Sequence, residues 1–195
     1  YLYTGATPRM LTGPAWLAYL KIADGCDHRC AFCTIPAIRG PYRSVPSGDV
    51  CRQLVELGGS GVREVCLIAQ DTSAWGRDLE PRGSLPRLLD DMAAVDYNGW
   101  LRLLYLHPTS LDEETVARVC GGAPFVPYFD IPLQHASRRV LQAMGRAGDA
   151  ERFMGLLEMI RRHDSKAAIR TTFIVGFPGE TPEDFETLLQ FVQAA

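Results

Sequence analysis

Short apolar runs alternate along the chain with longer segments in which apolar residues recur every three or four positions. Short runs bounded by turn residues are typical of buried strands, and the longer periodic segments are typical of amphipathic helices. The pattern predicts strands at residues 18–23, 64–69, 100–106, 128–133 and 168–175. It predicts helices at residues 47–57, 84–95, 110–120, 137–144, 149–163 and 181–195, with Ser47, Ser84, Ser110 and Thr181 as caps.

This strict alternation predicts an α/β domain with a parallel sheet and right-handed crossovers. At least five β-α units are expected, which suits an open doubly wound sheet or a (β/α) barrel. Residues 1–17 are rich in glycine, proline and threonine without a clear period, so we expect a linker there and a core over residues 18–195. Because the last helix has no C-terminal cap, we expect this core to be one domain of a longer protein.

Each predicted strand is followed by polar or glycine-rich residues. The carboxyl ends of parallel strands lie at one edge of a sheet, where α/β proteins place their chemistry. We therefore expect five segments to form a ring around one mouth. They are residues 26–33, 70–73, 107–109, 134–137 and 176–180.

The first of these segments carries three cysteines, Cys26, Cys30 and Cys33, spaced C-x-x-x-C-x-x-C. They are too close to serve as independent disulfides, so they indicate a metal or cluster site. A 4Fe–4S cluster that transfers electrons takes four thiolates, and three would leave one iron open to bind and activate a small molecule. A zinc site completed by His28 is an alternative, as is an interaction domain with buried cysteines.

Other polar-edge residues each have two interpretations. Arg170 lies inside an apolar strand, and a buried guanidinium needs an anion that a ligand carboxylate would supply. Phe32 either belongs to the core or faces a flat heterocycle, and Gly176 either forms a tight turn or admits a ligand closely. His107 fits a loop or core histidine better than a direct role, whereas His135 fits both equally well.

Composition excludes some classes of function. The chain has 195 residues, a net charge of −3 and a pI near 5.8, which argues against a general polyanion-binding surface. No apolar stretch approaches the roughly 18 residues that span a bilayer, and the first residues do not resemble a secretory signal. Cys51, Cys66 and Cys120 are scattered, so we interpret them as small buried residues in a reducing cytoplasm.

The cysteine spacing, with an aromatic residue before the third cysteine and a strand before the first, resembles the radical S-adenosylmethionine (SAM) superfamily. The resemblance covers about residues 8–195. Within it, the chain is similar to the methylthiotransferase branch at residues 19–26 (YLKIADGC), 35–36, 39–40, 132–137 (PLQHAS) and 170–181 (RTTFIVGFPGET). Residues 68–78 (IAQDTSAWGRD) and 133–137 resemble the ribosomal-protein type (RimO-like), although Ala74-Trp75 replaces its usual Ser-Tyr.

This resemblance implies a partial (β/α) TIM-like barrel of the radical SAM type. It implies one 4Fe–4S cluster with an open iron site, held by Cys26, Cys30 and Cys33, and S-adenosylmethionine bound at that iron. An electron would cleave SAM to methionine and a 5′-deoxyadenosyl radical, which abstracts hydrogen before sulfur is inserted. We expect SAM contacts from Phe32, Gln134, Ser137, Arg146, Arg170, Ile174 and Gly176.

The implied function is methylthiolation of an aspartate of a small-subunit ribosomal protein, in the cytoplasm. The implied electron donor is a flavodoxin or ferredoxin, with no membrane partner. The alternative substrate is an isopentenylated adenosine of tRNA (MiaB-like). Full-length members carry a second cluster on three further cysteines before this core and a substrate domain after it. Because the other cysteines here do not cluster, we expect this chain alone not to complete the reaction.

Overall fold

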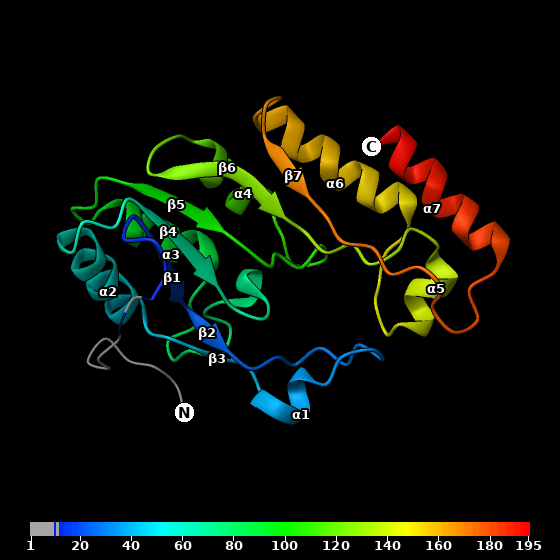
Figure 1. The fold of residues 1–195 in the computed structure, drawn as a ribbon, viewed down its shortest axis with the longest axis horizontal. Coiled ribbons are helices and arrows are strands. Elements are labelled where there is room, and N and C mark those ends of the chain that lie inside the picture. Colours follow the sequence, from blue (N-terminus) through cyan, green and yellow to red (C-terminus); the bar gives the residue numbers. More distant parts are fainter. Residues whose placement is uncertain (1–9, 11) are drawn as a thin grey trace.

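The computed structural model describes residues 10 and 12–195, and its centre is a five-stranded parallel sheet (Figure 1). The strand order β1-β4-β5-β6-β7 follows the sequence. A doubly wound sheet would reverse its order at a switch point, so this order identifies the wall of a (β/α) barrel and confirms the expected fold class. The strands are β1 (Leu17–Lys21), β4 (Glu64–Ile68), β5 (Trp100–Leu103), β6 (Phe125–Asp130) and β7 (Ala168–Arg170).

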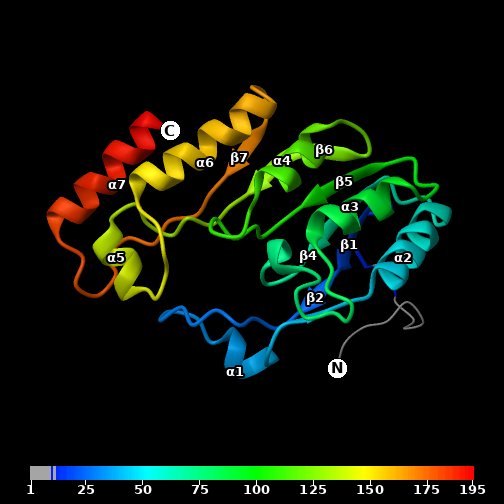
Figure 2. The ribbon, with the colours of Figure 1, turned by 180° about the vertical axis from the view of Figure 1, so that it is seen from behind.

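The long helices cover one face of this sheet, as the two opposite views show (Figures 1 and 2). Each contacts the next in a row: α2 (Ser47–Gly59), α3 (Leu85–Ala93), α4 (Glu113–Cys120), α6 (Ala150–His163) and α7 (Pro182–Ala194). The core lies between helices and sheet, where Leu101 and Leu103 of β5 are fully buried. Trp100 and Arg102 alternate with them and face the opposite side, and Trp100 is 62% exposed there.

Three short elements that the sequence pattern did not predict surround the cysteines. Strand β2 (Ala23–Asp24) pairs antiparallel with β3 (Arg43–Ser44), and helix α1 (Ile35–Arg39) lies between them in the chain. This small ladder closes a loop that contains all three clustered cysteines. Two further short elements, a 3-10 turn (Thr72–Ala74) and α5 (Arg138–Ala143), follow β4 and β6.

The first three predicted strands are confirmed to within a few residues, but the boundaries of the last two are wrong. Strand β6 begins and ends three residues before the predicted 128–133, and β7 ends at Arg170 instead of continuing to residue 175. The regular ladder between these strands ends at the pair Asp130 and Arg170, and Gln134 has a left-handed backbone with φ 73°. Beyond Arg170 the two segments pair again at an isolated bridge between Gln134 and Phe173, and the N–H of Leu133 donates to the Thr171 hydroxyl at 3.3 Å.

Helix starts were predicted with mixed success. Ser84 and Thr181 occupy the cap positions of α3 and α7 as expected. Ser47 and Ser110 are wrong, because Pro46 and Asp112 occupy the cap positions of α2 and α4. The Asp112 carboxylate accepts a hydrogen bond from the backbone N–H three residues later, which a carboxylate at this position does well.

The remaining predictions about the chain concern its start and its other cysteines. Most of the expected linker 1–17 lies outside the described residues, and β1 begins within it at Leu17. All six cysteines are free; Cys66 is buried as predicted, whereas Cys51 and Cys120 are half-buried against the core. No helix in the described part of the chain is long and apolar enough to cross a membrane.

Candidate cofactor site

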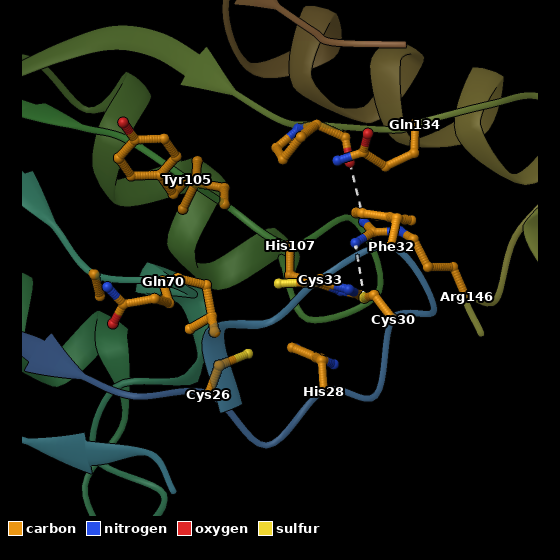
Figure 3. A pocket seen from close by; sticks show the side chains of 14 residues that line it. Cys26, His28, Cys30, Phe32, Cys33, Gln70, Tyr105, His107, Gln134 and Arg146 are labelled. Carbon is orange, nitrogen blue, oxygen red and sulfur yellow. Dashed lines mark hydrogen bonds between the residues drawn. The ribbon is translucent and has the colours of Figure 1, made fainter. Parts of the chain in front are cut away.

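The three cysteines lie on the loop that follows β2, at the carboxyl edge of the sheet (Figure 3). Cys26 is buried, and Cys30 and Cys33 are half-buried. The backbone N–H of Cys33 donates to the carbonyl of Cys30 at 3.0 Å. Gly25, at the start of the loop, has φ 80°, and a Cβ there would lie 2.1 Å from the Pro41 carbonyl oxygen. Only glycine fits this entry, so the loop's path depends on it.

Asp71 fixes the middle of the loop from the end of β4. Its carboxylate is 1% exposed, and its Oδ2 lies 2.7 Å from Nε2 of His28. Its Oδ1 accepts from the Ser73 hydroxyl at 2.6 Å. Although burial opposes it, the hydrogen bonds from His28 and Ser73 hold the pKa of Asp71 below its usual value. A buried carboxylate thus anchors the cysteine loop through His28.

The imidazole of His28 also stacks on that of His107, with ring centroids 4.0 Å apart and 8° between the planes. Burial lowers the pKa of His107 to about 3, and the charge of Arg146 adds to this effect, so the ring stays neutral at physiological pH. Nδ1 of His107 lies 2.9 Å from the Thr109 hydroxyl, from which a neutral ring can accept a hydrogen bond.

The donor atoms of His28, Asp71 and His107 lie within 4.8 Å of one another, close enough to consider a metal ion there. An imidazole binds a metal through a lone pair in the plane of its ring. Two parallel stacked rings cannot both direct such lone pairs to one ion between them. The cysteines are not part of this group, so the described residues do not bring His28 and the three thiols together as the ligands of one zinc ion.

Arg146, in the turn between α5 and α6, lies against the cysteine loop beside Cys30. Its Nη1 lies 3.8 Å from Sγ of Cys30, and its Nη2 donates to the carbonyl of Pro132 at 3.0 Å (Figure 3). The same turn receives a backbone hydrogen bond from Ala31 to the carbonyl of Met144 at 2.9 Å. A cation is thus held beside a thiol that would be negative when bound to a metal.

A cavity of about 350 Å³ opens beside the cysteine loop, which is within the size range of small-ligand sites. Four of the five predicted polar strand ends line it, so most of the expected ring is confirmed. The fifth segment, residues 176–180, does not contribute. The lining residues are Cys26, His28, Cys30, Phe32, Cys33, Ile35, Ala69, Gln70, Tyr105, Leu106, His107, Pro132, Gln134 and Arg146.

The residues present fit a metal cluster with an open position and a ligand beside it. All three thiols face one cavity from one loop. Burial raises the pKa of the Cys26 thiol, a cost that coordination to a metal would remove because metals bind the thiolate. Nε of Arg146 is buried at this cavity without a hydrogen-bond partner among the described residues, which leaves a donor for a bound ligand.

Of the predicted SAM contacts, Phe32, Gln134 and Arg146 line the cavity. Phe32 is 39% exposed, so part of its ring is accessible to a bound ligand. Gln134 is held at the bridge to the segment after β7, where its backbone carbonyl accepts from the N–H of Ile174 at 2.8 Å. Ile174 therefore neighbours the site through Gln134 although it does not line the cavity.

Three other predicted contacts lie outside the cavity. Ser137 is buried and donates its hydroxyl to Asp184 of α7 at 2.6 Å, so it supports that helix. Gly176 is exposed, and a Cβ placed on it would have no neighbouring atom within 4 Å among the described residues. The expectation of a buried Arg170 is wrong, because its side chain is 58% exposed, and its anionic partner is Asp130 at 3.3 Å.

His135 is a core residue in this structure, which decides between its two interpretations. It is fully buried, and its Nδ1 accepts from the backbone N–H of Ser137 at 2.9 Å. Sequence reasoning missed Tyr105 and the pairing of Asp71 with His28. The residues around Asp71 were recognised as a polar strand end, but nothing in the sequence marks Tyr105, which lines the cavity with a positive φ of 59°.

Comparison with known proteins places this site in a family. A model of the radical SAM superfamily matches residues 20–192. A protein of Moorella thermoacetica named "Ribosomal protein uS12 methylthiotransferase RimO" is 45% identical over 194 residues, which are 100% of this chain and 45% of that protein. The protein of the same name from Aquifex aeolicus is 44% identical over 95% of this chain and 43% of its own length. The chain therefore spans about half the length of these relatives.

Solved structures agree in fold. A radical S-adenosylmethionine methyltransferase, TsrM, from Kitasatospora setae, solved with cobalamin and a 4Fe–4S cluster, aligns with a TM-score of 0.73 and 20% identity over 91% of this chain and 34% of its own. Coproporphyrinogen III oxidase (HemN) from Escherichia coli, a radical SAM enzyme, aligns with a TM-score of 0.60 and 18% identity over 91% of this chain and 41% of its own. With its three-cysteine loop at the carboxyl edge of an open barrel wall, the chain belongs to the radical SAM superfamily.

Proposed function

We propose that this chain is the radical SAM core of a methylthiotransferase that modifies an aspartate of ribosomal protein uS12. The observation that carries the proposal is a loop with three cysteine ligands facing a ligand-sized cavity, which suits a cluster with one open iron. Identities of 41–45% to proteins named as uS12 methylthiotransferases support the choice of substrate. A cytoplasmic location and a flavodoxin or ferredoxin as electron donor belong to the same proposal.

In this proposal Cys26, Cys30 and Cys33 hold three irons of a 4Fe–4S cluster. When bound, the cluster and SAM supply reductive cleavage of a carbon–sulfur bond and abstraction of a hydrogen atom from an unactivated carbon. Arg146 places a positive charge beside Cys30, which stabilises the anionic thiolate. Phe32 offers a flat apolar face for the adenine.

Gln134 and the orphaned Nε of Arg146 offer polar contacts for the ribose and methionine ends of SAM. The other predicted SAM contacts do not line the cavity and stay predictions: Ser137, Arg170, Ile174 and Gly176. The side chains of Ser137 and Arg170 already bind carboxylates of the protein, Asp184 and Asp130.

The proposal is tested with the full-length protein purified without oxygen. We expect it to add a methylthio group to uS12, detected by mass spectrometry, with bulk tRNA unchanged. Cys30→Ala should remove about four iron and four sulfide per chain relative to the unmodified protein and abolish product. Cys51→Ala is the matched control, because Cys51 is a free cysteine on α2, away from the cavity.

Two results would overturn the proposal in different ways. Methylthio groups in tRNA instead of uS12 would transfer the function to the tRNA-modifying type. If Cys30→Ala instead removes one zinc per chain and no sulfide, the cluster itself is rejected.

A further inference from the structure

Two residues other than glycine have a positive φ in the described part of the chain, Tyr105 at 59° and Gln134 at 73°. Both line the cavity beside the cysteine loop. The left-handed region is unfavourable for side chains with a Cβ, and such residues persist where the surrounding structure enforces them, often at functional sites. Gln134 already has an expected role in binding SAM, whereas Tyr105 has none.

Neighbouring strand ends hold the backbone of Tyr105 on both sides. Its carbonyl accepts from the N–H of Thr72, after β4, at 3.0 Å. Its N–H donates to Oδ2 of Asp130, at the end of β6, at 3.2 Å. Asp130 is only 3% exposed and is itself fixed by Arg170 at 3.3 Å. These backbone contacts do not involve the phenol, so a glycine could form the same turn.

The phenol of Tyr105 has no structural partner that would explain it. It is 47% exposed and makes no hydrogen bond or ring contact within the described residues. In Figure 3 it stands on the side of the cavity away from Cys30 and Arg146. A large side chain is thus kept in a strained position with a free hydroxyl at the cavity rim.

Gln70 lies on the same side of the cavity (Figure 3). Its Oε1 is buried and has no hydrogen-bond partner among the described residues. A buried acceptor without a partner is costly, and a bound ligand that donates a hydrogen bond would satisfy it. This side of the cavity therefore offers one free hydroxyl donor and one free acceptor.

We propose that Tyr105 recognises the target residue: its hydroxyl donates to the carboxylate of the substrate aspartate, while Oε1 of Gln70 accepts from a peptide N–H of the same segment. This assignment rests on the proposed function. SAM is expected beside the cysteines and Arg146, which leaves the side of the cavity with Tyr105 and Gln70 for the acceptor. A hydrogen bond from a hydroxyl to a carboxylate is short and strong, which suits the positioning of the aspartate carbon from which hydrogen is abstracted.

The test uses the full-length holoenzyme and a uS12 peptide that contains the target aspartate. Tyr105→Phe removes only the hydroxyl, and we expect it to raise KM for the peptide about tenfold. It should also lower the amount of methylthiolated peptide formed per 5′-deoxyadenosine, because a loosely held substrate is missed. Tyr128→Phe is the matched control and should behave as the wild type, since Tyr128 on β6 stacks under Arg102 outside the cavity.

A second variant separates recognition from folding. Glycine suits the positive φ, so the Tyr105→Gly variant should keep its thermal stability. Its coupling, meaning the amount of methylthiolated peptide formed per 5′-deoxyadenosine, should nevertheless fall at least as far as in Tyr105→Phe. Wild-type KM and coupling in both variants would overturn the role of Tyr105 while leaving the proposed function intact. If the wild-type enzyme modifies tRNA and ignores the peptide, the proposed function fails, and this assignment fails with it.

Discussion

Asp71 anchors the cysteine loop to the end of β4 by hydrogen bonds. Its carboxylate is buried and reaches His28, which stands between the first two cysteines. The backbone carbonyl of Asp71 also accepts from the Tyr42 hydroxyl at 2.8 Å, on the far side of the loop. One aspartate thus connects the end of β4 to both the middle and the return of the loop.

Asp71→Asn keeps the size of this side chain but removes its charge. We expect the variant to bind its iron roughly tenfold more weakly, as is typical when a group behind a metal site is replaced. The measurement is the loss of iron to a chelator from anaerobically purified protein. Asp78→Asn is the control, because Asp78 accepts from Ser44 on β3 and not from a residue between the cysteines. Equal iron loss in the two variants would contradict the anchoring role.

At this scale the sequence predicts residues whose role depends on local spacing. Cys26, Cys30 and Cys33 could be assigned because three ligands on one loop converge wherever the loop lies. Arg170 could not, because its partner Asp130 is 40 residues away in the sequence and its exposure depends on the end of β7. Tyr105 could not either, because an enforced positive φ leaves no mark on residue type.

Among the elements, α7 depends most on its first turn. The hydroxyl of Thr181 accepts from the N–H of Asp184, whose carboxylate accepts in return from the N–H of Thr181 at 2.9 Å. Asp184 also receives the Ser137 hydroxyl, which joins α7 to the start of α5. This reciprocal cap satisfies two backbone donors that a helix start otherwise leaves open.

Thr181→Ala should lower the free energy of unfolding by about 1 kcal/mol, the usual cost of losing a cap. Urea unfolding monitored by circular dichroism measures it. Thr187→Ala is the matched control within the same helix, where the hydroxyl only donates to the carbonyl of Glu183. We expect no loss there, because alanine favours a helix interior. A loss at Thr187 equal to that at Thr181 would show that capping is not the cause.

Elements with a clear apolar pattern were predicted well, including the short helix α5, whereas α1, β2 and β3 were not. Helices α2 and α6 have clear apolar stripes, whereas α1 has five residues and no buried face. Strands β2 and β3 have two residues each, too few to show alternation. These three short elements are the ones that shape the cysteine loop, so the site's framework is less predictable than its ligands.

In the whole molecule, the residues that stabilise the fold and those that line the cavity lie in different regions. The helix-facing side of the sheet holds the core, and the carboxyl edge holds the cavity. Leu101→Ala, in the fully buried middle of β5, should therefore cost about 2–5 kcal/mol of unfolding free energy. The folded fraction should still bind SAM with wild-type affinity in equilibrium dialysis. Leu189→Ala, 39% exposed on α7, should change stability far less. Weaker SAM binding by folded Leu101→Ala would contradict this separation.

The contact between Arg146 and Cys30 has a consequence for how the protein is made. The two residues are 116 positions apart, yet the second completes the wall beside the first. At a synthesis rate of about 5–20 residues per second, the cysteines leave the ribosome roughly 6–23 s before this arginine does. During that interval the nascent chain carries the three thiols without this wall. The cavity wall beside Cys30 is therefore complete only after translation of the α5–α6 turn.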